Sequence, residues 1–295
     1  MTAARSRATL PTRAVVRVPA TTANLGPGFD TMGVALRLYN TVRLRRDAQA
    51  APLSGMFAET AAHFFATARL APFPVAIAVA GDVPQARGLG SSVTVRLGIV
   101  AGLNALAGEP LAPEAVLGLT VDLEGHPDNA VPAFHGGFAT CAPGRFFRAE
   151  VGARLKFVGL IPDFELETKK ARAVLPRQVP LADAIANLQY GALIAAAFAQ
   201  GDYESLTGAF EDRWHQPFRA KLIPGWDTVR AAAGKAGALG FYLSGAGSTL
   251  MALALGGDPA KAVARRMEAA AKTAGMGARA FIVSADNRGV IVTVR

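Results

Sequence analysis

The chain has 295 residues, of which 51% are hydrophobic and 18% charged, and it carries a formal net charge of +9. The length suggests about two domains, and the composition excludes both a disordered chain and a coiled coil. The single cysteine, Cys141, permits no internal disulfide and is expected to be a small core residue of a cytoplasmic protein.

The first half of the chain is predicted to alternate strands and helices. Apolar residues alternate with polar ones from 36 to 45, which is typical of a half-buried strand. Gly108 ends one helical pattern and Pro113 opens the next. In chain order we expect a strand over 15–19, a polar glycine-rich loop over 20–30, a strand over 36–45, a helix over 56–70, a strand over 74–80, helices over 93–106 and 113–124, and a strand over 138–142.

The second half mixes helices with antiparallel strands, which predicts an α+β fold. A looser stretch begins at Pro143, so a domain boundary is expected near residue 150. Residues 1–13 are expected to be a short disordered tail, and no uninterrupted apolar run indicates a membrane span. The expected elements are a strand over 155–161, helices over 181–200, 203–210 and 226–236, strands over 238–244 and 248–255, a helix over 259–274, and strands over 280–285 and 289–294.

The most informative segment is the Gly-Leu-Gly-Ser-Ser turn at 88–92, which joins a predicted strand to a predicted helix. Backbone N–H groups and the positive end of the helix dipole face such a turn, where a phosphate could bind. It is not a Walker loop, because the first lysine of the chain is Lys156. Glycine in such a turn can also be purely steric, and the segment by itself leaves the two interpretations about equally open.

Three motifs follow one another in the chain. They are Pro-Ala-Thr-Thr-Ala-Asn-Leu-Gly-Pro-Gly-Phe-Asp at 19–30, the turn at 88–92 with Glu-Gly-His-Pro-Asp-Asn at 124–129, and Leu-Ser-Gly-Ala-Gly-Ser-Thr at 243–249. Together they resemble the GHMP small-molecule kinases, and the first motif, with residues 168–172, is similar to the homoserine kinase branch. The resemblance implies a two-domain α+β fold, with an ATP-binding, left-handed βαβ domain over 14–150 and a ferredoxin-like α/β sandwich over 151–295.

The resemblance also implies a nucleotide site and a metal site. Ser92 and Glu124 would hold Mg²⁺, and both are hard oxygen ligands that suit this ion. A solvated carboxylate at a helix end remains the alternative for Glu124, although a carboxylate there opposes the helix dipole. The residues implied to bind ATP are Pro84, Arg87, Gly88, Leu89, Gly90, Ser91, Ser92, Val93 and Thr94.

The acceptor implied by the resemblance is L-homoserine, phosphorylated on its hydroxyl on the way to threonine. Arg172 and Arg219 would bind its carboxylate in a bidentate fork, although Arg213 competes with Arg219 for the role. His126 is expected to hydrogen-bond its loop, and no catalytic base is assigned. The implied substrate-binding residues are Asn24, Asp30, Asp128, Thr168, Arg172 and Arg219, and the implied catalytic residues are Asn129 and Arg172.

Two alternatives stay open at this point. One is another GHMP-type kinase with a different small alcohol, and the other is a non-catalytic nucleotide- or RNA-binding protein. Nucleic acid is not favoured, because the basic clusters at 43–46 and 169–172 are short. No membrane partner is expected, and a homodimer is left open. Two features depart from the family: Arg96 follows the serine pair, where it would face solvent or the nucleotide, and the adenine-side segment 46–74 is short.

Overall fold

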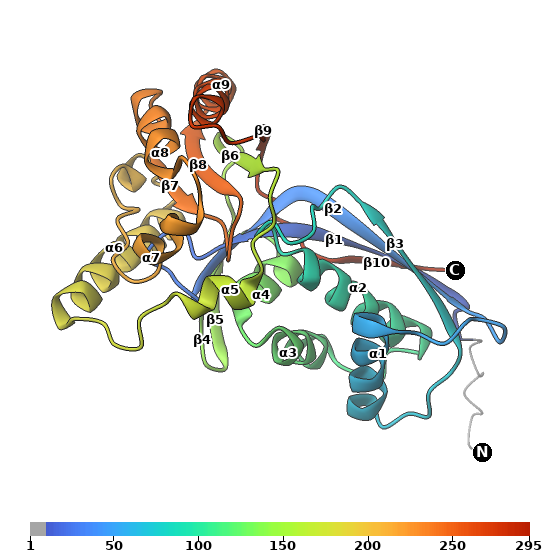
Figure 1. The fold of residues 1–295 in the computed structure, drawn as a ribbon. Coiled ribbons are helices and arrows are strands. Elements are labelled where there is room, and N and C mark those ends of the chain that lie inside the picture. The colour runs from blue at the N-terminus through green and yellow to red at the C-terminus, as the bar shows by residue number, and fades with distance from the viewer. Residues whose placement is uncertain (1–9) are drawn as a thin grey trace, which may run out of the picture.

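The computed structural model describes residues 10–295, so the first nine residues of the expected tail lie outside the described residues. Within the described chain, two antiparallel sheets meet near the middle of the molecule, and helices pack against each of them (Figure 1). This mixture of helices and antiparallel strands confirms the predicted α+β class.

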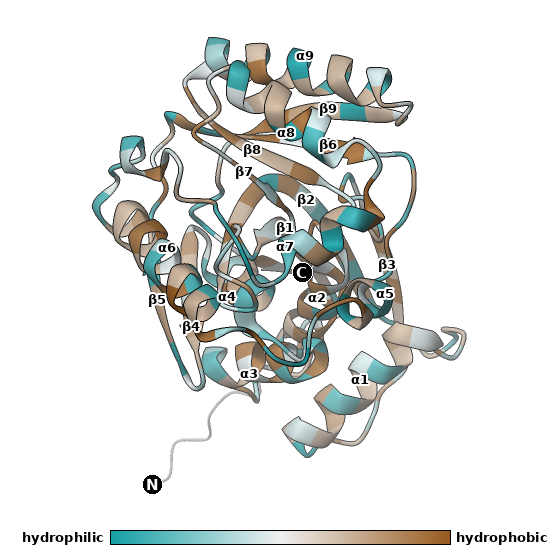
Figure 2. Cartoon of the chain, turned by 60° about the vertical axis from the view of Figure 1, so that its left-hand side comes forward, coloured by the Kyte–Doolittle hydropathy of each residue, from teal (hydrophilic) through white to brown (hydrophobic). Residues whose placement is uncertain are grey.

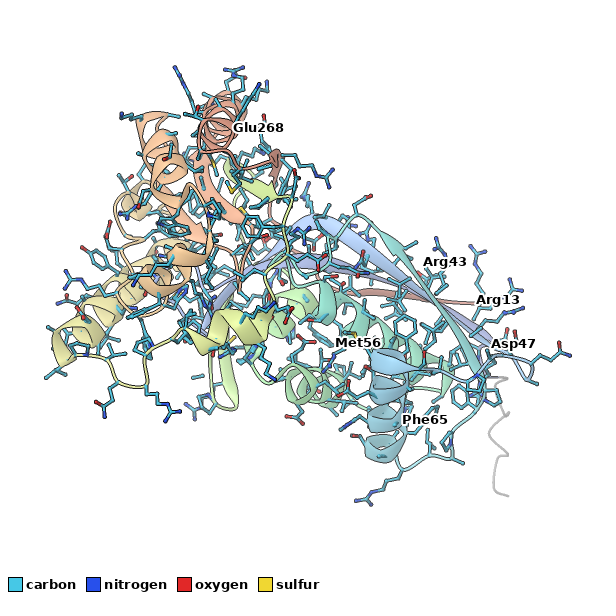
Figure 3. The ribbon with its side chains drawn as sticks, viewed as in Figure 1. Arg13, Arg43, Asp47, Met56, Phe65 and Glu268 are labelled. Carbon is cyan, nitrogen blue, oxygen red and sulfur yellow. The ribbon has the colours of Figure 1, made fainter. Side chains whose placement is uncertain are left out.

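The first sheet has the strand order β10-β1-β2-β4-β5, with β3 also paired to β2. Its long strands β1 (Arg13–Ala23) and β2 (Met32–Arg46) pair so that the buried Val16 lies opposite the buried Val42. Arg43 extends from β2 into solvent (Figure 3), while Leu44 is buried, as the alternation predicts. The remaining strands are β3 (Val75–Gly81), β4 (Phe138–Ala142), β5 (Arg145–Ala149) and β10 (Ile291–Val294).

Four helices belong to this part of the molecule. They are α1 (Gly55–Ala68), α2 (Ser91–Leu106), α3 (Pro113–Glu124) and α4 (Pro127–His135). Helix α2 lies against β1 and β2, and its Leu97 joins Val16 and Phe64 in one buried cluster. Because α2 is buried on most of its surface, its N-terminal turn is held in a fixed position relative to the sheet.

The second sheet has the order β7-β8-β6-β9, from β6 (Leu155–Pro162), β7 (Gly240–Leu243), β8 (Leu250–Leu255) and β9 (Ala278–Val283). Helices α8 (Trp226–Lys235) and α9 (Gly257–Thr273) pack together on it. The chain order β6-α8-β7-β8-α9-β9 with this strand order is the ferredoxin-like arrangement that was expected. Between β6 and α8 lie α5 (Thr168–Ala173), α6 (Leu181–Gln200) and α7 (Gln216–Arg219).

The two sheets share one core. A single buried cluster combines Phe138 of β4 with Phe157 of β6 and Tyr242 of β7. Phe198 of α6 stacks on Phe138, with ring centroids 4.4 Å apart. The C-terminal strand β10 pairs with β1, so the first sheet takes strands from both ends of the chain. The division at residue 150 therefore stays a prediction, and a cut there would separate β10 from its sheet.

Several local predictions were wrong. The expected helix over 203–210 is only a 3₁₀ turn (Glu204–Leu206), because Thr207 is extended and Gly208 adopts φ +78°. Residues 20–23 of the expected loop continue β1. Helices α4, α5 and α7 and strand β5 were not predicted. A second 3₁₀ turn (Ala220–Leu222) follows α7.

Helix α6 carries hydrophobic residues along its length (Figure 2), and in the described chain it is the one helix long and apolar enough to cross a membrane. Its inner side packs in the core through Ile194 and Phe198. Leu181 and Leu188 on its outer side are exposed.

Candidate active site

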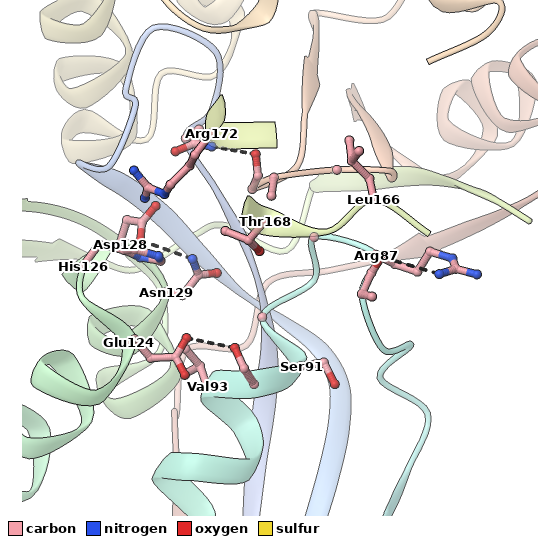
Figure 4. Close-up of a pocket in the computed structure, with 18 of the residues that line it drawn as sticks. Arg87, Ser91, Val93, Glu124, His126, Asp128, Asn129, Leu166, Thr168 and Arg172 are labelled. Atoms are coloured by element: carbon pink, nitrogen blue, oxygen red, sulfur yellow. Dashed lines mark hydrogen bonds and ion pairs between the residues drawn. The ribbon is translucent and has the colours of Figure 1, made fainter. Parts of the chain in front are cut away.

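The three sequence motifs converge on one cavity of about 340 Å³, bordered by the start of α2, the end of α3, the start of α4, and α5 (Figure 4). Gly245 from the third motif donates its N–H to Ala23 O and accepts from Asn24 Nδ2 at 2.8 Å. Ser244 Oγ donates to Gly88 O at 2.7 Å. The loop between β7 and β8 thus joins the first motif to the glycine turn and closes the cavity.

The glycine turn is both sterically constrained and open to the cavity. Gly88 has φ +72°, and a Cβ there would lie 2.1 Å from Ser244 O. Gly90 has φ +65°, and its Cβ would lie 2.0 Å from Thr21 Oγ1. Only glycine fits either position. Helix α2 begins at Ser91 with no side-chain cap, so its first N–H groups are left for another partner. The steric interpretation and the binding interpretation are therefore compatible.

Six of the predicted ATP-binding residues line the cavity, and three do not. Leu89 is buried in the core. Thr94 is also buried, with its hydroxyl bonded to Ser91 O and to Asn40 Nδ2. The guanidinium of Arg87 turns to the carbonyl of Pro162, away from the centre of the cavity (Figure 4). The residues that line the cavity are Arg87, Gly88, Gly90, Ser91, Ser92 and Val93, and those that do not are Pro84, Leu89 and Thr94.

Ser92 and Glu124 face each other across the α2 and α3 termini. Ser92 Oγ donates to Glu124 Oε2 at 2.8 Å. Glu124 Oε1 is buried without a hydrogen bond, 3.4 Å from Arg96 Nε, and burial raises the pKa of this carboxyl above its ordinary value. A hydroxyl beside a carboxylate oxygen that lacks a hydrogen bond is a hard donor set, and it fits Mg²⁺.

Arg96 was expected to face solvent or the nucleotide. Its side chain bridges the helices around the cavity: Nη1 donates to Leu123 O and Nη2 to Glu59 of α1 at 3.1 Å. It also lines the cavity beside Glu124. No sequence pattern indicates this bridge, because the contact depends on how α1 packs against α2.

Arg172 of α5 forms a two-pronged ion pair with Asp30, from Nη1 to Oδ2 at 2.9 Å and from Nη2 to Oδ1 at 2.8 Å. Asp30 and Asn24 both have positive φ, and Asn24 Oδ1 accepts the N–H of Asp30. These side chains therefore stabilise the loop and also line the cavity. The turn-forming interpretation and the binding interpretation do not exclude each other here.

Arg219 is almost fully buried, with Nε donating to Ala171 O at 3.0 Å and Nη1 to Gly245 O at 3.1 Å. In the described chain Nη2 makes no hydrogen bond, and Arg219 lines the cavity. Burial and the neighbouring Arg172 lower the pKa of Arg219 to about 10, which keeps it charged at neutral pH. The competing Arg213 pairs with Asp183 at the surface. The structure thus brings Arg219 to the cavity, and Arg213 is not among the lining residues.

The start of α4 contributes a further cluster of polar side chains to the cavity. His126 Nδ1 lies 2.6 Å from Asp128 Oδ1, and this hydrogen bond raises the pKa of His126. Asn129 Nδ2 donates to Asp128, while Thr21 Oγ1 donates to Asn129 Oδ1 at 2.6 Å. Thr168 of α5 lines the same side (Figure 4). Lining residues that were not assigned from sequence are Ala86, Arg96, Leu123, His126, Leu166, Gly245, Ala246 and Gly247.

Comparison with known proteins decides the family. The GHMP kinases N terminal domain matches residues 56–137, and the GHMP kinases C terminal model matches residues 194–273. A homoserine kinase of Microchaete diplosiphon is 43% identical over 293 residues, covering 93% of this chain and 95% of that protein. The chain belongs to the homoserine kinases of the GHMP family.

Further relatives agree. A homoserine kinase of Picosynechococcus sp. is 40% identical, covering 94% of this chain and 98% of that protein. A crystal structure of homoserine kinase from Cytophaga hutchinsonii has a TM-score of 0.89 at 25% identity, covering 98% of this chain and all of that one. GHMP kinases use ATP as the phosphate donor, so membership of this family supports ATP as the expected nucleotide.

Proposed function

We propose that the chain transfers the γ-phosphoryl group of ATP to the hydroxyl of L-homoserine in this cavity. One observation carries the proposal: a glycine turn at a helix N-terminus and two arginines with neighbouring carboxylates border the same cavity. The first group suits phosphates. The second suits a small zwitterion, because arginine pairs with a carboxylate and aspartate with an ammonium.

The nucleotide side is assigned to the glycine turn and α2. The first N–H groups of α2, with the hydroxyl of Ser91, would bind phosphate oxygens. Ser92 Oγ and Glu124 Oε1 would hold Mg²⁺, which when bound neutralises negative charge on the phosphates. Glu124 is suited to this because its buried Oε1 has no hydrogen bond to give up.

The amino acid side is assigned to the Asp30–Arg172 pair and Arg219. A zwitterion that enters here offers its ammonium to Asp30 and its carboxylate to Arg172. Each of the two side chains then replaces its partner in the ion pair with a substrate group of the same charge as that partner. Arg219 Nη2 adds a second donor for the carboxylate, and Asp128 and Thr168 border the remaining space. This exchange favours a substrate that carries both charges over an uncharged alcohol.

The acceptor hydroxyl is assigned to the space beside Asn129. Its amide is held by Thr21 and Asp128, so it has a fixed orientation. Phosphoryl transfer depends mainly on position and charge neutralisation and needs little covalent help. The chain's contribution is therefore to align the hydroxyl with the phosphate, and we assign no catalytic base.

A coupled ADP-release assay with homoserine, mevalonate, galactose and shikimate tests the proposal. We expect turnover with homoserine to exceed that with the others, because only homoserine offers both a carboxylate and an ammonium. Mevalonate and shikimate, which have a carboxylate alone, separate the arginines' role from that of Asp30. Preferred turnover of galactose, or ATP binding with no turnover of any alcohol, would contradict it.

We also propose a cytoplasmic enzyme with no nucleic acid or membrane partner. The single cysteine suits a reducing compartment. A homodimer is supported by the exposed apolar side chains Leu181, Ile185 and Leu188 on α6, which two copies could cover. Light scattering of the purified protein, with and without Leu188→Lys, tests the dimer.

A further inference from the structure

His215 lies behind the substrate side of the cavity and is completely buried. It is not among the residues that line the cavity. Its Nε2 lies 2.8 Å from the carbonyl oxygen of Gly26, in the loop that carries Asp30. A carbonyl oxygen can only accept, so Nε2 must carry the proton. This contact fixes the tautomer of the ring, and it leaves Nδ1 as a bare acceptor when the ring is neutral.

The bare Nδ1 faces Arg219, whose Nη1 lies 3.5 Å away and can only donate. A protonated ring would instead place two cations against each other. Burial lowers the pKa of His215 well below its ordinary value, although the carboxylate of Asp212, with Oδ2 3.4 Å from Nε2, opposes this shift, and the neutral ring is the form that suits both Gly26 and Arg219. Asp212 holds the segment in place, accepting the backbone N–H groups of Trp214, His215 and Gln216.

We propose that His215, as its neutral Nε2–H tautomer, is a positioning residue that orients Arg219 for the carboxylate of the amino acid substrate. The proposal rests on the proposed role of Arg219. Three acceptors fix the guanidinium plane: Ala171 O, Gly245 O and the Nδ1 of His215. Phe29 packs over both groups, with its ring centroid 5.0 Å from the Arg219 guanidinium and 5.0 Å from the imidazole.

Two substitutions of His215 distinguish the roles of its two ring nitrogens. The amide oxygen of Asn reaches the position of Nδ1 and can accept from Arg219, whereas the amide nitrogen of Gln reaches Nε2 and can donate to Gly26. We expect His215→Gln to raise the KM for homoserine about tenfold, the loss expected for one hydrogen bond to a charged group. We expect His215→Asn to rescue it, and neither to change the KM for ATP. The matched control is His63→Asn at an exposed histidine of α1.

The opposite ranking, with Gln rescuing and Asn failing, would overturn the proposal, because His215 would then act through Gly26 alone. Equal losses in both variants would overturn it as well. The compound 3-aminopropan-1-ol, which is homoserine without its carboxylate, distinguishes the two proposals. If the wild-type enzyme uses it as well as homoserine, the role of Arg219 fails. If the wild type discriminates but His215→Gln weakens both compounds equally, only the role of His215 fails.

A measurement on the unaltered protein keeps the proposal testable if these variants do not fold. The chain has four histidines, so ¹⁵N spectra of the imidazole nitrogens are simple. We expect one ring that does not titrate near neutral pH, with Nε2 protonated and Nδ1 bare. If none of the four rings is neutral near pH 7 with Nε2 protonated and Nδ1 bare, the assignment is overturned.

Discussion

Glu124 is a buried carboxylate: one of its oxygens accepts a hydrogen bond from Ser92, and the other has no hydrogen bond. If it holds Mg²⁺, Glu124→Gln removes the charge on which the metal depends. We expect kcat to fall about 100-fold or more while the KM for homoserine changes little, because each tenfold in rate costs only about 1.4 kcal/mol of transition-state stabilisation. Steady-state kinetics at saturating Mg²⁺, with Mn²⁺ binding as a second readout, test this.

Glu59 supplies the control, since it also pairs with Arg96 but is exposed and lies outside the cavity. Glu59→Gln is expected to leave kcat nearly unchanged. Normal turnover and metal affinity in Glu124→Gln would mean that Glu124 only stabilises the end of α3.

Arg172 binds Asp30 through both ends of its guanidinium, and we expect the substrate carboxylate to use the same planar group. Arg172→Lys keeps the charge and loses the fork. The KM for homoserine should rise at least about tenfold, since a hydrogen bond between charged groups contributes about 1.5–3 kcal/mol. The KM for ATP should change less. The control is Arg213→Lys, at the surface pair with Asp183. Equal effects on both substrates would exclude a carboxylate-specific role.

His126 should make stability depend on pH. Its hydrogen bond to Asp128 raises the pKa of His126 above the ordinary value of 6.5. Protonation therefore favours the folded state, and the stabilisation is complete below about pH 6.5 and is lost as pH rises through the raised pKa. The free energy of unfolding lost in His126→Gln should be larger at acidic than at alkaline pH in urea titrations. A pH-independent loss would mean that the pair is not ionic.

At the scale of elements, the glycine turn is the most sensitive segment. Gly90→Ala introduces a Cβ 2.0 Å from Thr21 Oγ1 at φ +65°. The left-handed conformation alone costs about 1–3 kcal/mol in a residue other than glycine. We expect a lower Tm and a higher KM for ATP. Gly118→Ala is the matched control, because its Cβ on α3 would meet nothing within 4 Å and alanine favours the helix. A functional, stable Gly90→Ala enzyme would contradict this account of the turn.

Elements with an uninterrupted pattern were predictable. Helix α3 begins at Pro113 and ends at Glu124 as expected, and α9 keeps its apolar spacing. Helix α4 was missed because Pro132 lies inside it, where proline normally argues against a helix. Helix α7 has four residues, too few for any periodicity. Sequence patterns report local preference, and these elements form through tertiary packing.

The site was predictable where residues lie within a motif, and less so where segments meet. Asp30 and Arg172 were assigned through the resemblance, but their ion pair joins residues far apart in the chain. The loop at 245–247 was noticed as a motif without being assigned to the cavity. Arg96 was noticed as a departure from the family without an assigned role, and Leu166 carries no sequence signal, because the place of each depends on neighbouring helices and strands. Spacing along a chain gives no distance between distant segments.

At the scale of the molecule, the cavity depends on both sheets. The glycine turn and α4 belong to the first half, whereas α5, Arg219 and the loop after β7 belong to the second. The shared core, with Phe138, Phe157 and Phe198, fixes the position of one half relative to the other. Because each half supplies one side of the site, any relative movement of the sheets changes the distance between the proposed phosphate and amino acid positions.

This shared core predicts that neither half folds alone. A fragment spanning residues 14–150 would lose β10, which pairs with β1 from Ala14 to Arg17, and would expose the side of Phe138 that stacks on Phe198. Burying a side chain of this size contributes about 1.5–3 kcal/mol, a large part of the net stability of a domain. We expect the fragment to aggregate or to unfold without a cooperative transition in thermal circular dichroism, and the full chain to unfold in a single calorimetric transition. Supplying residues 151–295 as a second chain should restore cooperative unfolding. A cooperatively folded fragment would contradict the prediction and would establish residue 150 as a true domain boundary.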